Sequence, residues 1–376
     1  MNTDIVKNID EIIEGFPFEG RLTEVAKASS GLINDTFVLT FSNDNIRRKY
    51  VLQHINTNVF RNPDELMSNI IGVTVFLKNK ISLQGGDPER ETLSFIYTVD
   101  NLPYLRASDG SCWRAYCYVG NSYTCDKVES PVMAMRAGQA FARFQTLLHD
   151  FQAEDLFETI PDFHNTPKRF EALKTAVERN ASGRLGDVGE QLEFALSREG
   201  EAGLVTGLLK SGGLPLRVIH NDTKISNVLF DKITNEALCV IDLDTVMPGS
   251  LLYDFGDSIR SGAVTSDENE TDHSKYGLDL ELYTGYCEGF VGACAGILTE
   301  KEAELLPFSV KLMALECGIR FLADYLDGDV YFKTDDPSRN LVRCINQFTL
   351  VRDVERNYEE MKRYTAEIYR RALIGE

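Results

Sequence analysis

The sequence predicts an α+β fold in two lobes, a small N-terminal β-sheet lobe that includes a helix and a larger, mainly helical C-terminal lobe. Apolar runs typical of strands lie between residues 20 and 119, whereas the apolar residues after residue 120 recur at helical spacing. Gly120-Asn121-Ser122 interrupts the pattern between the two parts. We therefore expect an N-terminal lobe of residues 1–119 and a C-terminal lobe of residues 120–376.

The N-terminal lobe is expected to combine strands with one amphipathic helix. Residues 25–41 predict a hairpin, and further strands are predicted near residues 91–99 and 112–119. A helix is predicted to begin at Asn62-Pro63, because apolar residues follow at helical spacing: Leu66, Ile70, Val73 and Leu77.

The C-terminal lobe is expected to open with a helix at Ser130-Pro131, where a capping residue precedes a proline. An apolar stripe follows, which we interpret as core: Ala137, Ala140, Phe141, Phe144, Leu147, Leu148 and Phe151. Further helices are predicted within residues 156–209 and 275–372.

One stretch among these segments is typical of a phosphate-transferring site. It reads His220-Asn221-Asp222-Thr223-Lys224-Ile225-Ser226-Asn227, and Val240-Ile241-Asp242-Leu243-Asp244 follows it. The spacing of the His, the Asp, the Asn and the second Asp is that of a kinase catalytic loop. Phosphoryl transfer needs one carboxylate for the attacking hydroxyl, and an Asn and another carboxylate for Mg²⁺. Asp222 is the candidate base, Asn227 and Asp242 are candidate metal ligands, and Asp244 is a further contact to metal or phosphate.

The local sequence also predicts how the second acid reaches the Asn. Residues 227–230 and 237–241 are typical of two strands joined by a polar turn. If Phe230 lies opposite Ala237, antiparallel pairing places Asp242 near Ile225 and so beside Asn227. A few oxygen ligands, completed by waters and phosphates, suit Mg²⁺ better than zinc. The alternative is a hairpin with polar ends in an unrelated α/β protein.

Three further residues are expected to support the loop. His220 is predicted to hold it in place, because Asp222 is the better-placed base, and Lys224 supports it from within. An Asp-Phe-Gly triplet starts at Asp254, which lies 254 − 222 = 32 residues past the candidate base, against 242 − 222 = 20 for Asp242. We therefore interpret the triplet as a decoy, in which Asp254 caps or braces its own segment through backbone N–H groups.

Two places in the N-terminal lobe are candidate nucleotide contacts. Residues 29–36 are small and polar, as in loops whose backbone N–H groups cover phosphate; an ordinary hairpin turn is the alternative. The candidates in this loop are Asn34, Asp35 and Thr36. In the order of a kinase, the adenine would bind backbone groups near residues 118–120, which adds Tyr118 and Gly120.

The motif His-x-Asp-x-x-x-x-Asn followed by Ile-Asp resembles the aminoglycoside phosphotransferase and choline kinase superfamily, relatives of the protein kinases. Longer strings resemble its N-acetylhexosamine 1-kinase branch: HNDTKISNVLF, VIDLDTVMPG, LYDFGDSIR, GLINDTFVL, YVLQHINTNVFRNP and LECGIRFLADYLDGDVYFK. They run from about Gly31 to Lys333 and so span most of the chain. The resemblance implies a protein-kinase-like bilobal fold that binds ATP and Mg²⁺. It implies Asp222 as the base, Asn227 and Asp242 as metal ligands, and Arg320 as a contact to the sugar.

The sequence departs from this family's pattern at two positions. Asn221 stands where a Gly is usual, which bears on the backbone of the loop. Gln53 stands on the strand Tyr50-Val51-Leu52-Gln53-His54 where a phosphate-pairing Lys is expected. A Gln can hydrogen-bond a phosphate, so Gln53 stays a candidate nucleotide contact, but it cannot offset the charge. Either Lys49, Arg61 or another cation takes that part, or this branch manages without it.

Glu316, Arg320 and Asp324 are spaced i, i+4 and i+8 on a predicted helix. One interpretation is a solvated ladder of ion pairs, each worth a few tenths of a kcal/mol. The other is a polar wall of the acceptor site, in which Arg320 and Asp324 bind sugar hydroxyls or an N-acetyl group.

Composition limits the partners of the chain. It has 39 basic and 58 acidic residues, a formal net charge of −19, which disfavours nucleic acids and anionic membranes. Residues 1–14 are charged, and no apolar run approaches the roughly 20 residues of a membrane span. The eight cysteines include no CxxC pair, which favours reduced thiols. We expect a cytoplasmic monomer or weak homo-oligomer that binds small molecules only.

Together these features predict a small-molecule kinase. Asp222 would orient the anomeric hydroxyl of an N-acetylhexosamine (GlcNAc or GalNAc) for in-line attack on the γ-phosphate of ATP, giving the sugar 1-phosphate and ADP. The nearest alternative is a kinase for another small hydroxyl acceptor, such as choline, homoserine or an aminoglycoside. Gln53 and Asn221 also leave open a catalytically weak nucleotide-binding module that regulates a partner.

Overall fold

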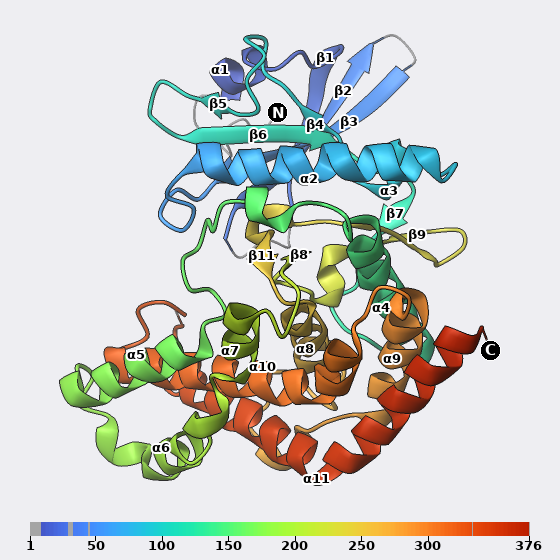
Figure 1. Cartoon of the computed structure of the whole chain (residues 1–376). Helices are drawn as coiled ribbons and strands as arrows, with labels where there is room; N and C mark the ends of the chain where they lie inside the picture. Colours follow the sequence, from blue (N-terminus) through green and yellow to red (C-terminus); the bar gives the residue numbers. More distant parts are fainter. Residues whose placement is uncertain (1–8, 29–32, 44–45, 333, 376) are drawn as a thin grey trace. The chain divides into compact units, whose positions relative to one another are not determined.

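The structure, a computed structural model, describes residues 9–28, 33–43, 46–332 and 334–375. The chain divides into two compact units. The first comprises Met1–Tyr123, Asp155–Pro161 and Phe230–Met247; the second comprises Thr124–Glu154, Asp162–Leu229 and Pro248–Glu376. The first contains the large antiparallel sheet and the second contains most of the helices (Figure 1). The division at residue 119 concerns the functional lobes and stays a prediction.

A six-stranded antiparallel sheet forms the centre of the first unit. Its order is β1-β2-β3-β6-β4, with β5 paired to β6. The strands are β1 (Arg21–Lys27), β2 (Asp35–Asn43), β3 (Ile46–Ile55), β4 (Phe95–Ile96), β5 (Leu105–Arg106) and β6 (Cys112–Cys117). Alternate residues of a strand share one face, and Phe37, Leu39 and Phe41 of β2 are accordingly buried with Trp113 and with α1 (Ile9–Glu14).

The helix predicted after Asn62 is α2 (Pro63–Leu83). It begins where expected, because the Asn62 side chain accepts the Glu65 N–H and Pro63 occupies the first turn. The strand predicted near residues 91–99 is largely wrong: only β4 is extended there, and a helical turn, α3 (Pro88–Glu91), precedes it. Asp87 caps this turn by accepting the Glu89 N–H, so the Asp-Pro pair starts a helix.

The predicted hairpin after the catalytic loop is confirmed. A three-stranded sheet has the order β10-β9-β7, with β7 (Ser122–Tyr123), β9 (Val228–Asp231) and β10 (Ala237–Val240). The Asp231 N–H donates to the Glu236 carbonyl at 2.9 Å, which is the register that sets Phe230 opposite Ala237. The Asp231 carboxylate closes the turn by accepting the N–H groups of Ile233 and Thr234, and these bonds together with Arg90 lower its pKa to about 2.

The second unit is helical around one central helix. Its helices are α4 (Pro131–Leu147), α5 (Thr166–Arg179), α6 (Gly189–Leu196), α7 (Leu204–Ser211), α8 (Leu251–Gly262), α9 (Leu280–Cys294), α10 (Glu300–Asp327) and α11 (Arg339–Ile374). Most residues of α10 are buried, since it packs against α5, α8 and α11, while α4 packs against α9 (Figure 1). A short pair of strands, β8 (Arg217–Ile219) and β11 (Met247–Gly249), precedes the catalytic loop and α8 respectively.

Local signals explain where the main helices begin and end. Ser130 caps α4 as predicted by accepting the Met133 N–H. Thr299 and Glu302 form a capping box at the start of α10, and Gly328 ends that helix with φ of +95°. Single 3₁₀ turns fill the connections: η2 (Ala153–Asp155), η3 (Leu185–Asp187), η4 (Glu199–Glu201), η5 (Ile225–Asn227), η6 (Leu243–Thr245) and η7 (His273–Lys275).

Two expectations from composition can be compared with the structure. All eight cysteines are free thiols, as expected. Among the described helices, none combines the length and the apolar character needed to cross a bilayer.

Candidate active site

The second unit brings three residues of the predicted catalytic loop together. Asn227 Nδ2 donates to the Asp222 carbonyl at 2.8 Å and to Asp222 Oδ2 at 3.0 Å. Lys224 Nζ lies 2.8 Å from the same carboxylate oxygen. The Asp222 side chain keeps 33% of its surface exposed, so a substrate hydroxyl can reach it. The loop therefore presents an accessible carboxylate held by an amide and an ammonium.

The contacts of Asn227 also fit a hard cation. Its amide nitrogen makes both bonds to Asp222, which leaves Oδ1 as the oxygen that can bind a metal. Amide and carboxylate oxygens are suitable Mg²⁺ ligands when phosphates and waters complete the shell. Among the described residues, no group of three or more His, Cys, Asp or Glu is arranged to hold a metal ion, and a Mg²⁺–nucleotide site does not require one.

Asp254 anchors the start of the loop from α8. Its carboxylate accepts the N–H of His220 at 2.9 and 3.1 Å, the N–H of Asn221 at 2.8 Å and the Gln145 amide at 2.8 Å. Burial raises the pKa of Asp254, although His220 and these hydrogen bonds act in the opposite direction. The expectation that Asp254 caps its own segment is wrong.

Ser250 caps α8 instead, by accepting the Leu252 N–H. Gly256 has a packing role, since a Cβ on it would collide with the Ser309 backbone of α10. The Asp-Phe-Gly triplet thus serves to anchor the loop and to pack α8.

His220 is fully buried, as its supporting role requires. Its ring packs in a T-shaped arrangement with the rings of Phe141 and Phe144, at centroid distances of 5.7 and 5.9 Å. Its Nδ1 accepts the Asp222 N–H at 3.3 Å. The imidazole therefore fixes the backbone of the candidate base.

Asn221 adopts a left-handed backbone conformation with φ of +67°. Glycine enters this region without strain, and Asn does so more readily than other residues with a Cβ. The departure from the family's Gly is therefore compatible with the loop conformation.

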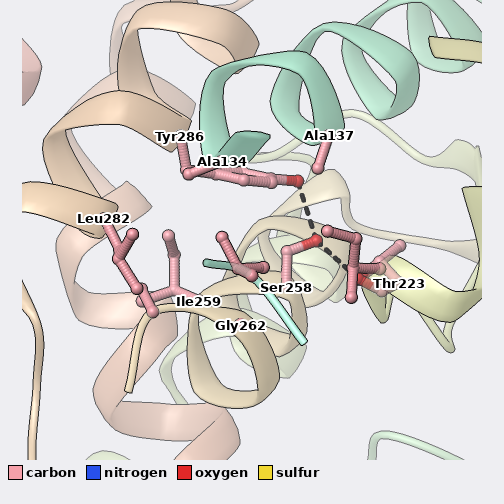
Figure 2. A pocket seen from close by; sticks show the side chains of 11 residues that line it. Ala134, Ala137, Thr223, Ser258, Ile259, Gly262, Leu282 and Tyr286 are labelled. Carbon is pink, nitrogen blue, oxygen red and sulfur yellow. Dashed lines mark hydrogen bonds between the residues drawn. The ribbon is translucent and has the colours of Figure 1, made fainter. Parts of the chain in front are cut away.

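Side chains behind the loop hold it from the other helices. Tyr286 donates to Ser258 Oγ at 2.7 Å, and Ser258 donates to the Thr223 carbonyl at 2.9 Å (Figure 2). The Thr223 N–H donates to Asp257, whose carboxylate is paired with Arg260 at 2.8 Å. Figure 2 shows a small, mostly apolar cavity beside this chain of bonds. Its volume of about 10 Å³ suits one water, so it is not an acceptor site.

The first unit contains the second acidic pair. Asp242 has a left-handed backbone with φ of +63° and immediately precedes η6, which contains the buried Asp244. One Asp244 oxygen lies 2.5 Å from Arg114 Nη1, and the other accepts a hydrogen bond from Asn34. Both oxygens of Asp244 are thus engaged, which favours a bracing role over the metal contact expected from the sequence. Asp242 belongs to the first unit and Asn227 to the second, so their shared metal site stays a prediction.

Two of the predicted phosphate contacts, Gln53 and Thr36, are hydrogen-bonded to each other in the same unit. Gln53 Nε2 donates to Thr36 Oγ1 at 3.1 Å. Asn34 Oδ1 accepts the Asn56 N–H, in addition to the bond from Asn34 to Asp244. Asp35 is exposed and pairs with Lys27 at 2.6 Å. Residues 29–32 of the predicted loop lie outside the described residues.

The predicted adenine contacts already have partners within the first unit. The Tyr118 N–H donates to the Lys49 carbonyl, and the Lys49 ammonium lies 5.6 Å from the Tyr118 ring centroid. The Gly120 carbonyl accepts a bond from Arg90 at 3.2 Å. Adenine binding near these residues stays a prediction.

Arg320 lies among aromatic rings of the second unit. Its guanidinium is 5.8 Å from the ring centroids of Phe163 and Tyr331 and 5.3 Å from that of Phe332. Asp324 accepts the N–H groups of Tyr331 and Phe332 at 2.8 and 2.9 Å, and so holds the turn that carries two of these rings. A direct contact of Asp324 with a sugar stays a prediction.

Glu316 shows that this helix face is not a solvated ladder. It is 1% exposed and accepts bonds from His164 at 2.9 Å and Thr166 at 2.6 Å. Burial alone would raise the pKa of Glu316, but the nearby charge of His164 and these bonds lower it. The interpretation as exposed ion pairs is therefore wrong.

Sequence reasoning missed three residues that hold candidate site residues in place, each within its own unit. They are Arg114, Gln145 and Asp257. Only Arg114 carried a signal, since a charged residue between Trp113 and Ala115 is unusual in an apolar strand.

Comparisons with known proteins decide the family. The model of the phosphotransferase enzyme family matches residues 24–281, which is more than half of the chain. This chain belongs to the phosphotransferase enzyme family. The family's match includes most of the sheet of the first unit and the catalytic loop of the second.

Solved structures confirm the protein-kinase-like fold expected of this phosphotransferase. An aminoglycoside phosphotransferase from Alicyclobacillus acidocaldarius has a TM-score of 0.56 at 12% identity, covering 96% of both chains. A spectinomycin phosphotransferase, solved with ADP and spectinomycin, has a TM-score of 0.55 at 13% identity, covering 91% of this chain and 95% of its own. An ethanolamine kinase from Plasmodium vivax has a TM-score of 0.54 at 15% identity, covering 92% and 85%.

Proposed function

We propose that this phosphotransferase is a small-molecule kinase that transfers the γ-phosphate of ATP to the anomeric hydroxyl of an N-acetylhexosamine. The observation that carries the proposal is the accessible Asp222 carboxylate, held by Asn227 and Lys224 in a loop anchored on Asp254. Membership of the family supports the transfer of a phosphate, and the sequence strings of the 1-kinase branch support the sugar.

Each residue of the loop has a distinct part in the proposed reaction. Asp222 Oδ2 or Oδ1 accepts a hydrogen bond from the sugar hydroxyl and takes its proton as the bond to phosphorus forms. Lys224 lies beside this carboxylate and supplies positive charge close to the attacking oxygen. The proton leaves the hydroxyl for Asp222, and the bond from the γ-phosphorus to the bridging oxygen breaks to release ADP.

The oxygens proposed to hold Mg²⁺ are Asn227 Oδ1 and the Asp242 carboxylate. A bound Mg²⁺ would offset the negative charge that develops on the phosphates during transfer. Asp242 is positioned by its left-handed backbone at the end of β10, and Asn227 by its two bonds to Asp222.

Arg320 and its three aromatic neighbours are the proposed sugar contacts. A guanidinium can donate to sugar hydroxyls or to an N-acetyl carbonyl, while rings cover the apolar face of a sugar. Asp324 contributes by fixing the turn of residues 328–332, whether or not it reaches the sugar.

The alternative function is that of a kinase for an amino alcohol or an aminoglycoside. Solved structures of this fold include an aminoglycoside phosphotransferase and an ethanolamine kinase. A catalytically weak binding module is less favoured, because Asn221 keeps the backbone conformation that the loop needs. A cytoplasmic location and a monomeric or weakly associated state belong to the same proposal.

A panel of acceptors tests the substrate directly. GlcNAc, GalNAc, glucose, choline, ethanolamine, homoserine and spectinomycin are each incubated with ATP and Mg²⁺ while ADP release is followed. We expect turnover with an N-acetylhexosamine, and ³¹P NMR should place the phosphate on the anomeric oxygen. Phosphate on a 6-hydroxyl, or turnover only with an amine-bearing acceptor, would overturn the sugar 1-kinase assignment while leaving the kinase assignment intact.

A further inference from the structure

In the first unit, Gln53 stands at the position of the expected strand lysine and forms a buried pair with Arg114. Gln53 of β3 lies directly opposite Arg114 of β6 in the sheet. Arg114 Nε donates to Gln53 Oε1 at 3.0 Å, and the Arg114 residue is only 2% exposed. A cation therefore lies one strand away from the place where the family's pattern expects it.

This contact fixes the direction of the Gln53 amide. A guanidinium has five N–H donors and no acceptor, so only the amide oxygen of Gln53 can face Arg114. The amide nitrogen must then point the other way, and Gln53 Nε2 donates to Thr36 Oγ1 at 3.1 Å. Because Nε2 carries two hydrogens, one N–H remains for a further acceptor beside Thr36.

The charge of Arg114 is secured by acidic neighbours. Burial alone would lower its pKa, but Asp244, which pairs with it at 2.5 Å, and the nearby Asp242 keep that pKa raised. Asn34 binds the other oxygen of Asp244 and so completes the support. The chain of contacts runs through the described part of the first unit without interruption: Thr36, Gln53, Arg114, Asp244 and Asn34.

We propose that Gln53 and Arg114 together replace the missing strand lysine: Arg114 turns the Gln53 amide so that its remaining N–H serves the nucleotide phosphates, and polarises that amide without touching the nucleotide. Gln53 is then the phosphate-binding residue and Arg114 a positioning residue. This inference rests on the proposed kinase function, since it assigns a nucleotide contact of the same site.

The other candidate cations fit this position less well. Lys49 lies four residues from Gln53 along the same strand, about 13 Å away, and its ammonium lies over the Tyr118 ring. Arg61 lies after β3, in the exposed turn that precedes α2. Arg114 alone among the three contacts Gln53.

The deciding variant is Gln53→Glu, which keeps the size of the side chain and its attraction to Arg114 but removes both N–H donors. Calorimetry would measure its affinity for MgADP and for adenosine, which shares the base and ribose but lacks phosphates. We expect MgADP binding to weaken by about tenfold or more, as for the loss of a hydrogen bond to a charged group, and adenosine binding to stay unchanged. KM for ATP should rise by a similar factor.

Two further variants separate positioning from folding. Gln53→Lys combined with Arg114→Met moves the cation to the strand position and should restore MgADP affinity to within about threefold of wild type. Arg48→Met removes an exposed arginine of the same strand, which pairs at the surface with Glu19, and should leave both affinities unchanged.

Three outcomes are decisive. Folded Gln53→Glu that binds MgADP as tightly as wild type would overturn the inference, as would equal weakening of MgADP and adenosine binding. Wild-type protein that is folded but binds no MgADP would overturn the proposed kinase function itself. Selective loss of MgADP affinity in Gln53→Glu supports the inference, whether or not the double variant folds.

Discussion

Single residues explain how the chain departs from its family's pattern and still builds the catalytic loop. Asn221 takes the left-handed conformation that a Gly would take, with φ of +67°. Its N–H is held by Asp254, which also binds the His220 N–H. The conformation at this position is therefore fixed by the anchor on α8 as well as by the residue itself.

Substitution of Asn221 should show this preference. Asn221→Gly should retain turnover and thermal stability, because Gly accepts a positive φ without strain. Asn221→Ala should lose about 1–2 kcal/mol of stability, the cost of a left-handed conformation for a residue with a Cβ. Thermal melts and turnover measurements would compare the two variants, and equal effects of Gly and Ala would contradict the role assigned to the backbone.

The sequence predicted those site residues that lie close together in the chain. Asp222, Lys224 and Asn227 fall within one loop, and their spacing alone implies that they meet. Arg114 reaches Gln53 across 61 residues and Gln145 reaches Asp254 across 109. No local pattern encodes such pairs, because they depend on strand register and helix packing.

At the scale of elements, helix starts were predictable where a cap and a proline coincide. Ser130-Pro131 and Asn62-Pro63 both begin helices in the structure, since capping is a local interaction. The strand expected near residues 91–99 is only the two-residue β4 in the structure, and the helical turn started by Asp87-Pro88 extends to Glu91. Helix packing, by contrast, depends on residues that carry no local signal.

The close contact between α4 and α9 depends on glycines, which have no side chain to separate the two helices. A Cβ at Gly138 of α4 would lie 2.5 Å from the Tyr286 carbonyl of α9. Gly285 and Gly289 of α9 face the α4 backbone equally closely. The two helix backbones therefore approach each other at glycines, next to the tyrosine whose hydroxyl supports the catalytic loop.

Gly138→Ala should destabilise the protein by about 1–3 kcal/mol, because the added methyl group overpacks a backbone contact. Gly292→Ala is the matched control. Gly292 lies on the partner helix α9, but it has open space around its Cβ position. That variant should be neutral or more stable by up to about 1 kcal/mol, as Ala favours the helix. Denaturant unfolding of both proteins would measure the difference, and similar losses would show that the helix contact is not as close as described.

At the scale of the whole molecule, buried carboxylates make stability depend on pH. Glu316 of α10 binds His164 and Thr166 at the start of α5, and its pKa is lowered in the folded state. The unfolded chain therefore binds a proton at this group more readily than the folded protein does. The stabilisation is present above the ordinary glutamate pKa of 4.5 and is lost as the pH falls through the lower folded-state pKa.

Glu316→Gln should cost about 1–3 kcal/mol at neutral pH, because buried donors lose a charged acceptor. The difference in unfolding free energy from wild type should shrink as the pH falls below 4.5. Glu359→Gln, at an exposed position of α11, should show no such change. Urea unfolding at several pH values would measure this difference in unfolding free energy. Parallel curves of unfolding free energy against pH for wild type and Glu316→Gln would contradict the lowered pKa.

Asp222→Asn tests most directly whether the loop performs phosphoryl transfer. The substitution keeps the size of the side chain and removes the group that takes the proton. ADP release with the best acceptor should fall by at least about 100-fold, while the melting temperature and MgADP affinity stay close to wild type. Turnover within about tenfold of wild type would show that Asp222 is not the base.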